Sequence, residues 1–248
     1  MKKAIITFMI SMCLLTTYAG IPKKIRNAFA FCYNNTYTGL DTLINIDGYF
    51  KEISTVKRSP TVGGFLRDTT DYYIQTSYHC FLFYDNGLYV YNIRDTNDKR
   101  EEYNVSLYLE EILENDKTED AKVFYDNHWG SYIVSGDTIK VQRLHKSRSF
   151  NDFWSGSEIW YKIIDKNTIQ FINSIALTTD EKEKERVRND YLPSYLKSTG
   201  LSVFAPLVEK PSYENSWILK EKWFWCNESD WEAYMEKIKQ KKKDHKKK

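Results

Sequence analysis

Three segments of the chain alternate hydrophobic and polar positions on both sides of a tight turn. Residues 80–93 place two aromatic, apolar runs around an Asp-Asn-Gly turn, and Asn-Gly readily adopts the positive φ angles of a hairpin. Residues 128–144 repeat the pattern around Ser-Gly-Asp, and residues 158–175 repeat it around Asp-Lys-Asn. Three successive antiparallel hairpins predict a meander that closes into a barrel or a sandwich.

Further strands are expected on both sides of the hairpins. Residues 43–55 alternate in the same way, and residues 71–84 form a long run that leads into the first hairpin. Residues 202–208 indicate a short strand, and residues 217–225 indicate a closing strand because their Trp and Leu side chains share one parity. About eight strands in all predict a mainly β protein, an antiparallel up-and-down barrel.

Two segments have the period of a helix instead. Residues 105–113 place apolar side chains on one helical face, and the helix is inserted between strands. It either covers the open end of the barrel as a lid or packs against the barrel wall. A C-terminal helix is expected to begin near Ser229, with Glu232 in the capping-box position. Residues 179–189 are almost wholly charged and predict an exposed helix or loop.

The first 19 residues have the pattern of an export signal. Lys2 and Lys3 precede an apolar run, and small residues before position 20 favour cleavage after Ala19. The chain is therefore expected in the periplasm or at the cell surface of a bacterium. An uncleaved N-terminal anchor is one alternative, and lipidation at Cys13, within a loose lipobox, is another.

These patterns divide the chain into four parts. Residues 1–19 are the signal peptide and residues 20–40 a polar tether. The barrel domain spans residues 41–226, with insertions at 94–122 and 178–215, and residues 227–248 form the C-terminal helix and a lysine-rich tail.

Charge is strongly segregated along the chain. The formal net charge is +2 in total, +5 in residues 1–26 and +7 in residues 237–248, which leaves −10 for residues 27–236. An acidic body argues against a nucleic-acid partner. The basic tail either contacts an anionic membrane or is a disordered, solubilising end.

Removal of the signal would leave three cysteines, an odd number. Cys80 and Cys226 both lie in predicted strands and are the candidates for a disulfide. The alternative is that all three are reduced and pack as small apolar residues.

Motifs of catalysis and metal binding are missing from the sequence. The four His residues do not have metal-binding spacing, and there is no Cys-x-x-Cys, nucleophile elbow or phosphate-binding glycine loop. We therefore expect no metal and no cofactor, and we favour a protein that is not an enzyme. A hydrolase whose two carboxylates meet only in the folded chain is the weaker alternative.

Short motifs resemble those of the lipocalins. Residues 47–50, Asp-Gly-Tyr-Phe, resemble an aromatic variant of the Gly-x-Trp signature that opens lipocalin barrels, with Phe50 in place of Trp. Residues 130–139 and 158–169 resemble the paired strands of bacterial lipocalin-like domains. The resemblance covers about residues 40–226, and it implies a calyx that binds small apolar molecules and has no catalytic residues.

Strand parity then supplies candidates for the wall of such a calyx, with ordinary core packing as the alternative for each. The candidates are Phe81, Phe83, Tyr132, Tyr161, Phe171 and Trp223. The function expected is that of an exported, non-enzymatic binding protein with a small apolar ligand. The alternative is a cell-envelope module that binds a protein or a glycan through its outer face.

Overall fold

The computed structural model describes most of the predicted barrel and its C-terminal helix. It describes residues 20–58, 61–62, 65–66, 73–91, 105–115, 117–146, 154–190 and 200–245. The predicted signal peptide, including Cys13, lies outside the described residues, as do the first part of the insertion at 94–122 and the last three residues of the tail.

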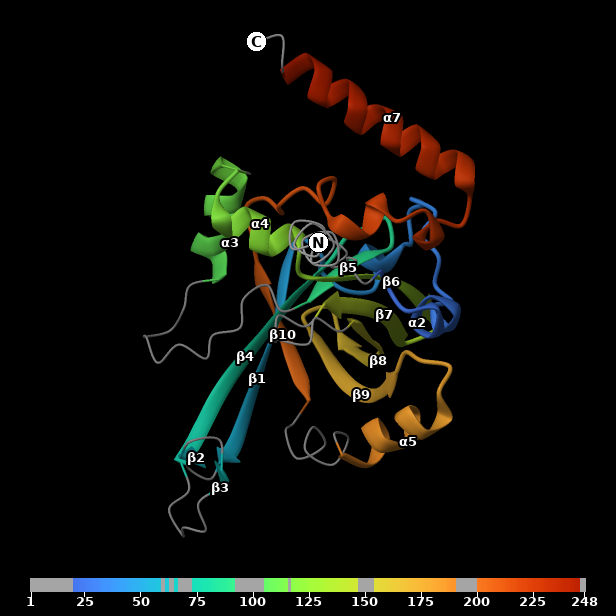
Figure 1. Cartoon of the computed structure of the whole chain (residues 1–248). Coiled ribbons are helices and arrows are strands. Elements are labelled where there is room, and N and C mark those ends of the chain that lie inside the picture. The colour runs from blue at the N-terminus through green and yellow to red at the C-terminus, as the bar shows by residue number, and fades with distance from the viewer. Residues whose placement is uncertain are drawn as a thin grey trace, which may run out of the picture.

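Eight antiparallel strands form a closed barrel (Figure 1). Around the barrel the order is β1-β10-β9-β8-β7-β6-β5-β4, so every strand except β1 and β10 lies between its neighbours in the sequence. The strands are β1 (Gly48–Arg58), β4 (Tyr73–Phe83), β5 (Leu88–Tyr91), β6 (His128–Ser135), β7 (Thr138–Lys146), β8 (Trp154–Asp165), β9 (Thr168–Ala176) and β10 (Leu201–Pro206). The prediction of an up-and-down barrel of about eight strands is confirmed.

All three predicted hairpins are present, as β4–β5, β6–β7 and β8–β9. Gly87 and Gly136 occupy the first two turns with φ angles of 93° and 63°, which side chains other than glycine rarely adopt. Strands β1 and β4 stay paired as far as Arg58 and Tyr73. The chain between them contains a small sheet of β2 (Thr61–Val62) and β3 (Phe65–Leu66), seen at the bottom of Figure 1.

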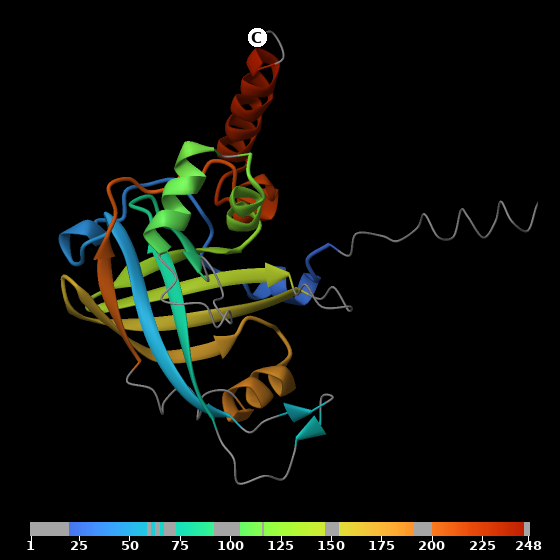
Figure 2. The ribbon, with the colours of Figure 1, turned by 90° about the vertical axis from the view of Figure 1, so that its left-hand side faces the viewer.

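Strand β5 is buried on both faces. In β5, Tyr89 and Tyr91 belong to the cluster inside the barrel, whereas Leu88 and Val90 belong to a second cluster on its outer wall. The predicted amphipathic helix is confirmed as α3 (Val105–Glu114), and with α4 (Glu119–Tyr125) it supplies part of that outer cluster. Figure 2 shows α3 lying along the barrel, so it packs against the wall and is not a lid.

One end of the barrel is closed by the chain that precedes β1. Leu40 and Ile44, in and just after the 3₁₀ helix η1 (Leu40–Thr42), are fully buried in the inner cluster. The backbone N–H of Thr38 donates to Asp85 O at 2.8 Å, and that of Asn45 donates to Lys166 O at 2.8 Å. This segment is thereby joined to the hairpin turns at that end, which we call the closed end.

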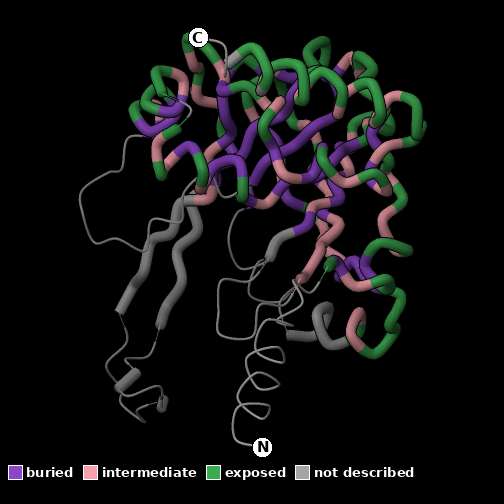
Figure 3. The backbone as a smooth tube through the Cα atoms, turned by 45° about the horizontal axis from the view of Figure 1, so that its top comes forward, coloured by how far each residue is buried: buried purple, intermediate pink, exposed green. Residues whose placement is uncertain are grey.

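Residues 20–40 pack on the barrel and do not form the expected tether. They include α2 (Lys23–Ala28), whose Ile25 is buried together with Ile21 against Leu144 and Leu177. The purple segments of the tube in Figure 3 are the buried residues, which gather in the interior of the fold, with exposed residues in green around them.

The predicted closing strand at 217–225 is wrong. The segment forms two 3₁₀ turns, η2 (Trp217–Lys220) and η3 (Lys222–Phe224), and β10 closes the barrel instead. Because β1 already pairs with both β4 and β10, no strand edge is left for this segment. Its aromatic side chains pack on the outer surface, where the indole N–H of Trp217 donates to Asn127 O at 2.9 Å.

The remaining helices agree with the sequence pattern. The charged segment forms α5 (Glu181–Asp190), and the C-terminal helix is α7 (Glu228–His245), which begins one residue before Ser229. In Figures 1 and 2, α7 extends away from the barrel. No helix within the described part of the chain combines the length and the apolar character needed to cross a membrane.

The disulfide joins Cys32 to Cys226, so the predicted pairing of Cys80 with Cys226 is wrong. Cys80 is free, 1% exposed, and part of the outer-wall cluster under α3 and α4. Cys32 and Cys226 meet because the neighbouring Tyr33 exchanges backbone hydrogen bonds with the C-terminal segment: its N–H donates to Phe224 O and its C=O accepts from the Cys226 N–H, both at 2.8 Å.

Thiol counting tests this pairing. Without reductant, unfolded residues 20–248 should show one free thiol, and Cys80→Ser should leave none. In the native chain Cys80 should react slowly, because burial raises the pKa of its thiol to about 12. Two free thiols in the Cys80→Ser variant would contradict the Cys32–Cys226 bond.

Replacing both Cys32 and Cys226 by Ser should lower the free energy of unfolding by about 2–5 kcal/mol in urea denaturation.

Candidate functional site

Five of the six predicted wall residues lie inside the barrel. Phe81, Phe83, Tyr132, Tyr161 and Phe171 all belong to the inner cluster and are between 0% and 8% exposed. Trp223 does not, because it lies in η3 on the outside, packed partly against α2 and its surroundings. Trp223 was assigned to the wall because a strand was expected at 217–225. That strand does not form, so the assignment of Trp223 is wrong as well.

These aromatic side chains are packed against one another. The ring centroids of Phe81 and Tyr161 are 5.2 Å apart, as are those of Phe83 and Tyr132. The hydroxyl groups of Tyr89 and Tyr161 meet at 3.2 Å near the middle of the barrel. Such distances are typical of a filled core, so toward the closed end the described side chains occupy the interior themselves.

Toward the opposite end the inward positions become polar. Because side chains alternate along a strand, Glu52 lies on the same face of β1 as Phe50, and Arg143 on the same face of β7 as Val141. The equivalent positions of the neighbouring strands complete a ring that we call the polar end. Its members are Glu52, His79, Tyr91, His128, Arg143, Ser157 and Ser202.

Tyr91 is at the centre of this ring. His79 and His128 stack on either side of it, each with its ring centroid 5.9 Å from that of Tyr91. The guanidinium carbon of Arg143 lies 3.4 Å from the Tyr91 ring centroid, a cation–π contact, and its Nε donates to Ser157 Oγ at 3.0 Å. These contacts hold a positive charge at a fixed position inside the barrel.

Glu52 is buried beside that charge. The residue is 3% exposed, and its Oε1 atom has no hydrogen-bond partner among the described residues. Burial raises the pKa of the carboxyl group, and the positive charge of Arg143 opposes that shift. Ser202, fully buried on β10, likewise has a hydroxyl without a partner in the described part of the chain. An unsatisfied buried polar group costs about 1–3 kcal/mol.

The polar end places a guanidinium, a carboxyl group and a hydroxyl group next to an aromatic core. Glu52 is the only carboxyl residue among the described members of the inner cluster and the polar end, so no acid pair is assembled there. Within the described residues no three His, Cys, Asp or Glu side chains are placed to hold a metal ion.

Glu52 and Arg143 were not among the residues selected from the sequence. The signal was present, because each lies two positions from an apolar residue that faces the interior. A polar residue at an inward parity interrupts the apolar pattern, and such local conflicts are expected at functional sites. Comparisons with known proteins give no further guide: no family model, no curated protein and no solved structure matches the chain.

Truncation of Phe81 distinguishes a filled core from an empty calyx. Phe81→Ala should lower the free energy of unfolding by about 3–5 kcal/mol, since it removes a fully buried ring from a packed interior. Ile133→Ala, at a site 42% exposed on the outer face of β6, is the control and should cost less than about 1 kcal/mol. Equal, small losses in urea denaturation for both variants would contradict the filled core.

Glu52→Gln should make the fold more stable at neutral pH. With its pKa raised in the folded state, Glu52 keeps its proton to a higher pH than in the unfolded chain. Wild-type stability should therefore fall as pH rises from the ordinary value of 4.5 through the folded pKa. The variant escapes that loss, so its melting temperature should exceed that of wild type at about pH 7.5 and match it near pH 4.

The control for this comparison is Glu111→Gln, which removes the same charge from an exposed position of α3. A Glu52→Gln variant that is less stable than wild type at neutral pH would mean that the fold depends on an ionised Glu52 paired with Arg143.

Proposed function

We propose that this chain is an exported, non-enzymatic binding protein with a lipocalin-like barrel, which binds a small molecule at the polar end. The observation that carries the proposal is the buried Glu52 Oε1, which has no hydrogen-bond partner among the described residues although it faces a fixed guanidinium. A bound molecule that hydrogen-bonds to Glu52 would remove the cost of leaving that atom unsatisfied.

The packing of the interior limits what the ligand can be. A wholly apolar molecule in the barrel would have to displace rings that already contact one another, such as Phe81 and Tyr161. A ligand with a hydrogen-bonding head group would find its partners together, because Arg143 and Ser202 lie at the same end as Glu52. We therefore infer a small ligand whose polar head enters the barrel, with an acceptor oxygen for Arg143.

Two features support the other parts of the proposal. The Cys32–Cys226 disulfide is typical of exported proteins, since disulfides persist in oxidising compartments. The eight-stranded up-and-down architecture is the one that lipocalins use to hold a single small ligand.

Native mass spectrometry of residues 20–248 purified from cells tests the proposal. A reproducible extra mass should be present and should be released by denaturing extraction as a small molecule with a polar group. Arg143→Met should lower the occupancy of that molecule about 10-fold or more, because it removes a half-buried charged partner. Lys162→Met, which removes an exposed charge from the outer face of β8, should not change it.

The outcome that contradicts the proposal has two parts. The purified chain would have a clean apo mass, and no member of a panel of fatty acids, sterols and small aromatic acids would raise its melting temperature. Equal occupancy in the Arg143→Met variant and in wild type would place any bound molecule elsewhere.

A further inference from the structure

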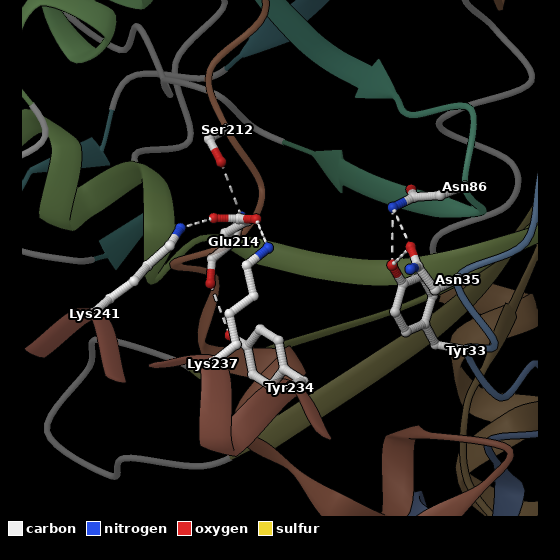
Figure 4. A network of polar contacts seen from close by, with 8 residues as sticks. All are labelled: Tyr33, Asn35, Asn86, Ser212, Glu214, Tyr234, Lys237 and Lys241. Atoms are coloured by element: carbon white, nitrogen blue, oxygen red, sulfur yellow. Dashed lines mark hydrogen bonds and ion pairs between the residues drawn. The ribbon is translucent and has the colours of Figure 1, made fainter. Parts of the chain in front are cut away.

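A groove of about 370 Å³ lies on the outer surface, between residues 33–35 and the start of α7. Figure 4 shows some of the residues that line it, among them Tyr33, Glu214 and Tyr234. This volume falls within the roughly 300–1,000 Å³ of pockets that hold small ligands. The groove is separate from the polar end of the barrel, because its lining shares no residue with that ring.

Aromatic side chains make up much of its wall. Tyr33, Tyr213, Trp225 and Tyr234 all line the groove. The ring centroids of Tyr33 and Trp225 are 4.8 Å apart, and those of Trp225 and Tyr234 are 5.5 Å apart. Tyr33 and Trp225 also form a β-bridge next to the Cys32–Cys226 disulfide. The rings are therefore held in place by covalent and backbone contacts before any ligand arrives.

On one side of the groove, amide groups are fixed by a small hydrogen-bond network. The Tyr33 hydroxyl donates to Asn35 Oδ1 at 2.7 Å, and Asn86 Nδ2 donates to the same hydroxyl at 2.8 Å, as the dashed lines of Figure 4 show. Asn35 has a φ of 53°, the one positive value outside glycine in the described part of the chain. Strained backbone of this kind is frequent where a side chain must be presented to a ligand.

On the other side, the groove is lined by charges that already have partners. Glu214 accepts hydrogen bonds from Lys237, at 2.5 Å, and from Lys241, and both lysines lower the pKa of its carboxyl group. The Tyr234 hydroxyl donates to Glu214 O at 2.7 Å, which holds α7 against this segment. Asp230 adds a second carboxylate to the lining. The lining thus offers acceptors and donors but little uncompensated charge.

We propose that this groove binds a neutral saccharide. A sugar ring presents C–H faces that stack on aromatic rings, and hydroxyl groups around its edge that pair with carboxylate and amide groups. Trp225 and Tyr234 supply the rings, and Asp230 and Asn35 supply the hydrogen-bonding groups. An anionic ligand is disfavoured because Lys237 and Lys241 are already paired with Glu214.

Isothermal titration calorimetry with neutral tetrasaccharides tests the proposal. The probes are cellotetraose, chitotetraose, maltotetraose and mannotetraose, and at least one should bind saturably, with a dissociation constant on the order of 1 mM or tighter. Ala233 is exposed on α7 and lines the groove, so Ala233→Trp fills it without removing a buried contact. That variant should weaken the binding about 10-fold or more.

Glu232→Trp is the matched control, because it adds the same side chain at an exposed position of α7 that does not line the groove. It should bind like wild type, and so should Arg143→Met, which separates this site from the one proposed in the barrel. The proposal is overturned if none of the four probes binds saturably, if only a sulfated oligosaccharide from heparin binds, or if Ala233→Trp binds like wild type. Equal melting temperatures of the two Trp variants would show that both are folded.

Discussion

Closure of the barrel is the constraint on which the rest of the structure depends. Each of its eight strands is hydrogen-bonded on both sides, so no strand edge is left for another segment of the chain. Every other segment of the chain must therefore pack through its side chains, either inside the barrel or on its outer wall. The helices α3 and α4, the N-terminal segment and the two 3₁₀ turns at 217–224 all take the second course.

Closure also fixes the volume of the interior, and the sequence fills it unevenly. Large rings occupy the part toward the closed end, where Leu40 and Ile44 seal it. Farther along, the inward positions carry Glu52 and Arg143, whose side chains bring ionisable groups into a region of low dielectric. One barrel thus combines an aromatic core with a polar end, built from different residues of the same strands.

The two ends of the described chain meet on the outside of this barrel. Tyr33 pairs with Trp225, and the adjacent disulfide joins residues separated by 194 positions. The contact between Tyr234 and Glu214 then orients α7, and the groove on the outer surface lies between these joined segments. The groove therefore depends on long-range contacts that form only when both ends of the chain are in place.

By itself the sequence determined the elements whose signals are local. Turn residues such as Gly87 and Gly136 set the three hairpins, and the helical period of residues 105–113 set α3, because each depends on neighbours in the chain. Only the tertiary structure decided which distant segments meet. From the sequence, Cys226 could pair with either Cys32 or Cys80, and the backbone pairing of Tyr33 with the C-terminal segment selected Cys32. The alternating Trp residues at 217–225 suited a strand as well as two turns, and closure of the barrel by β10 left only the turns.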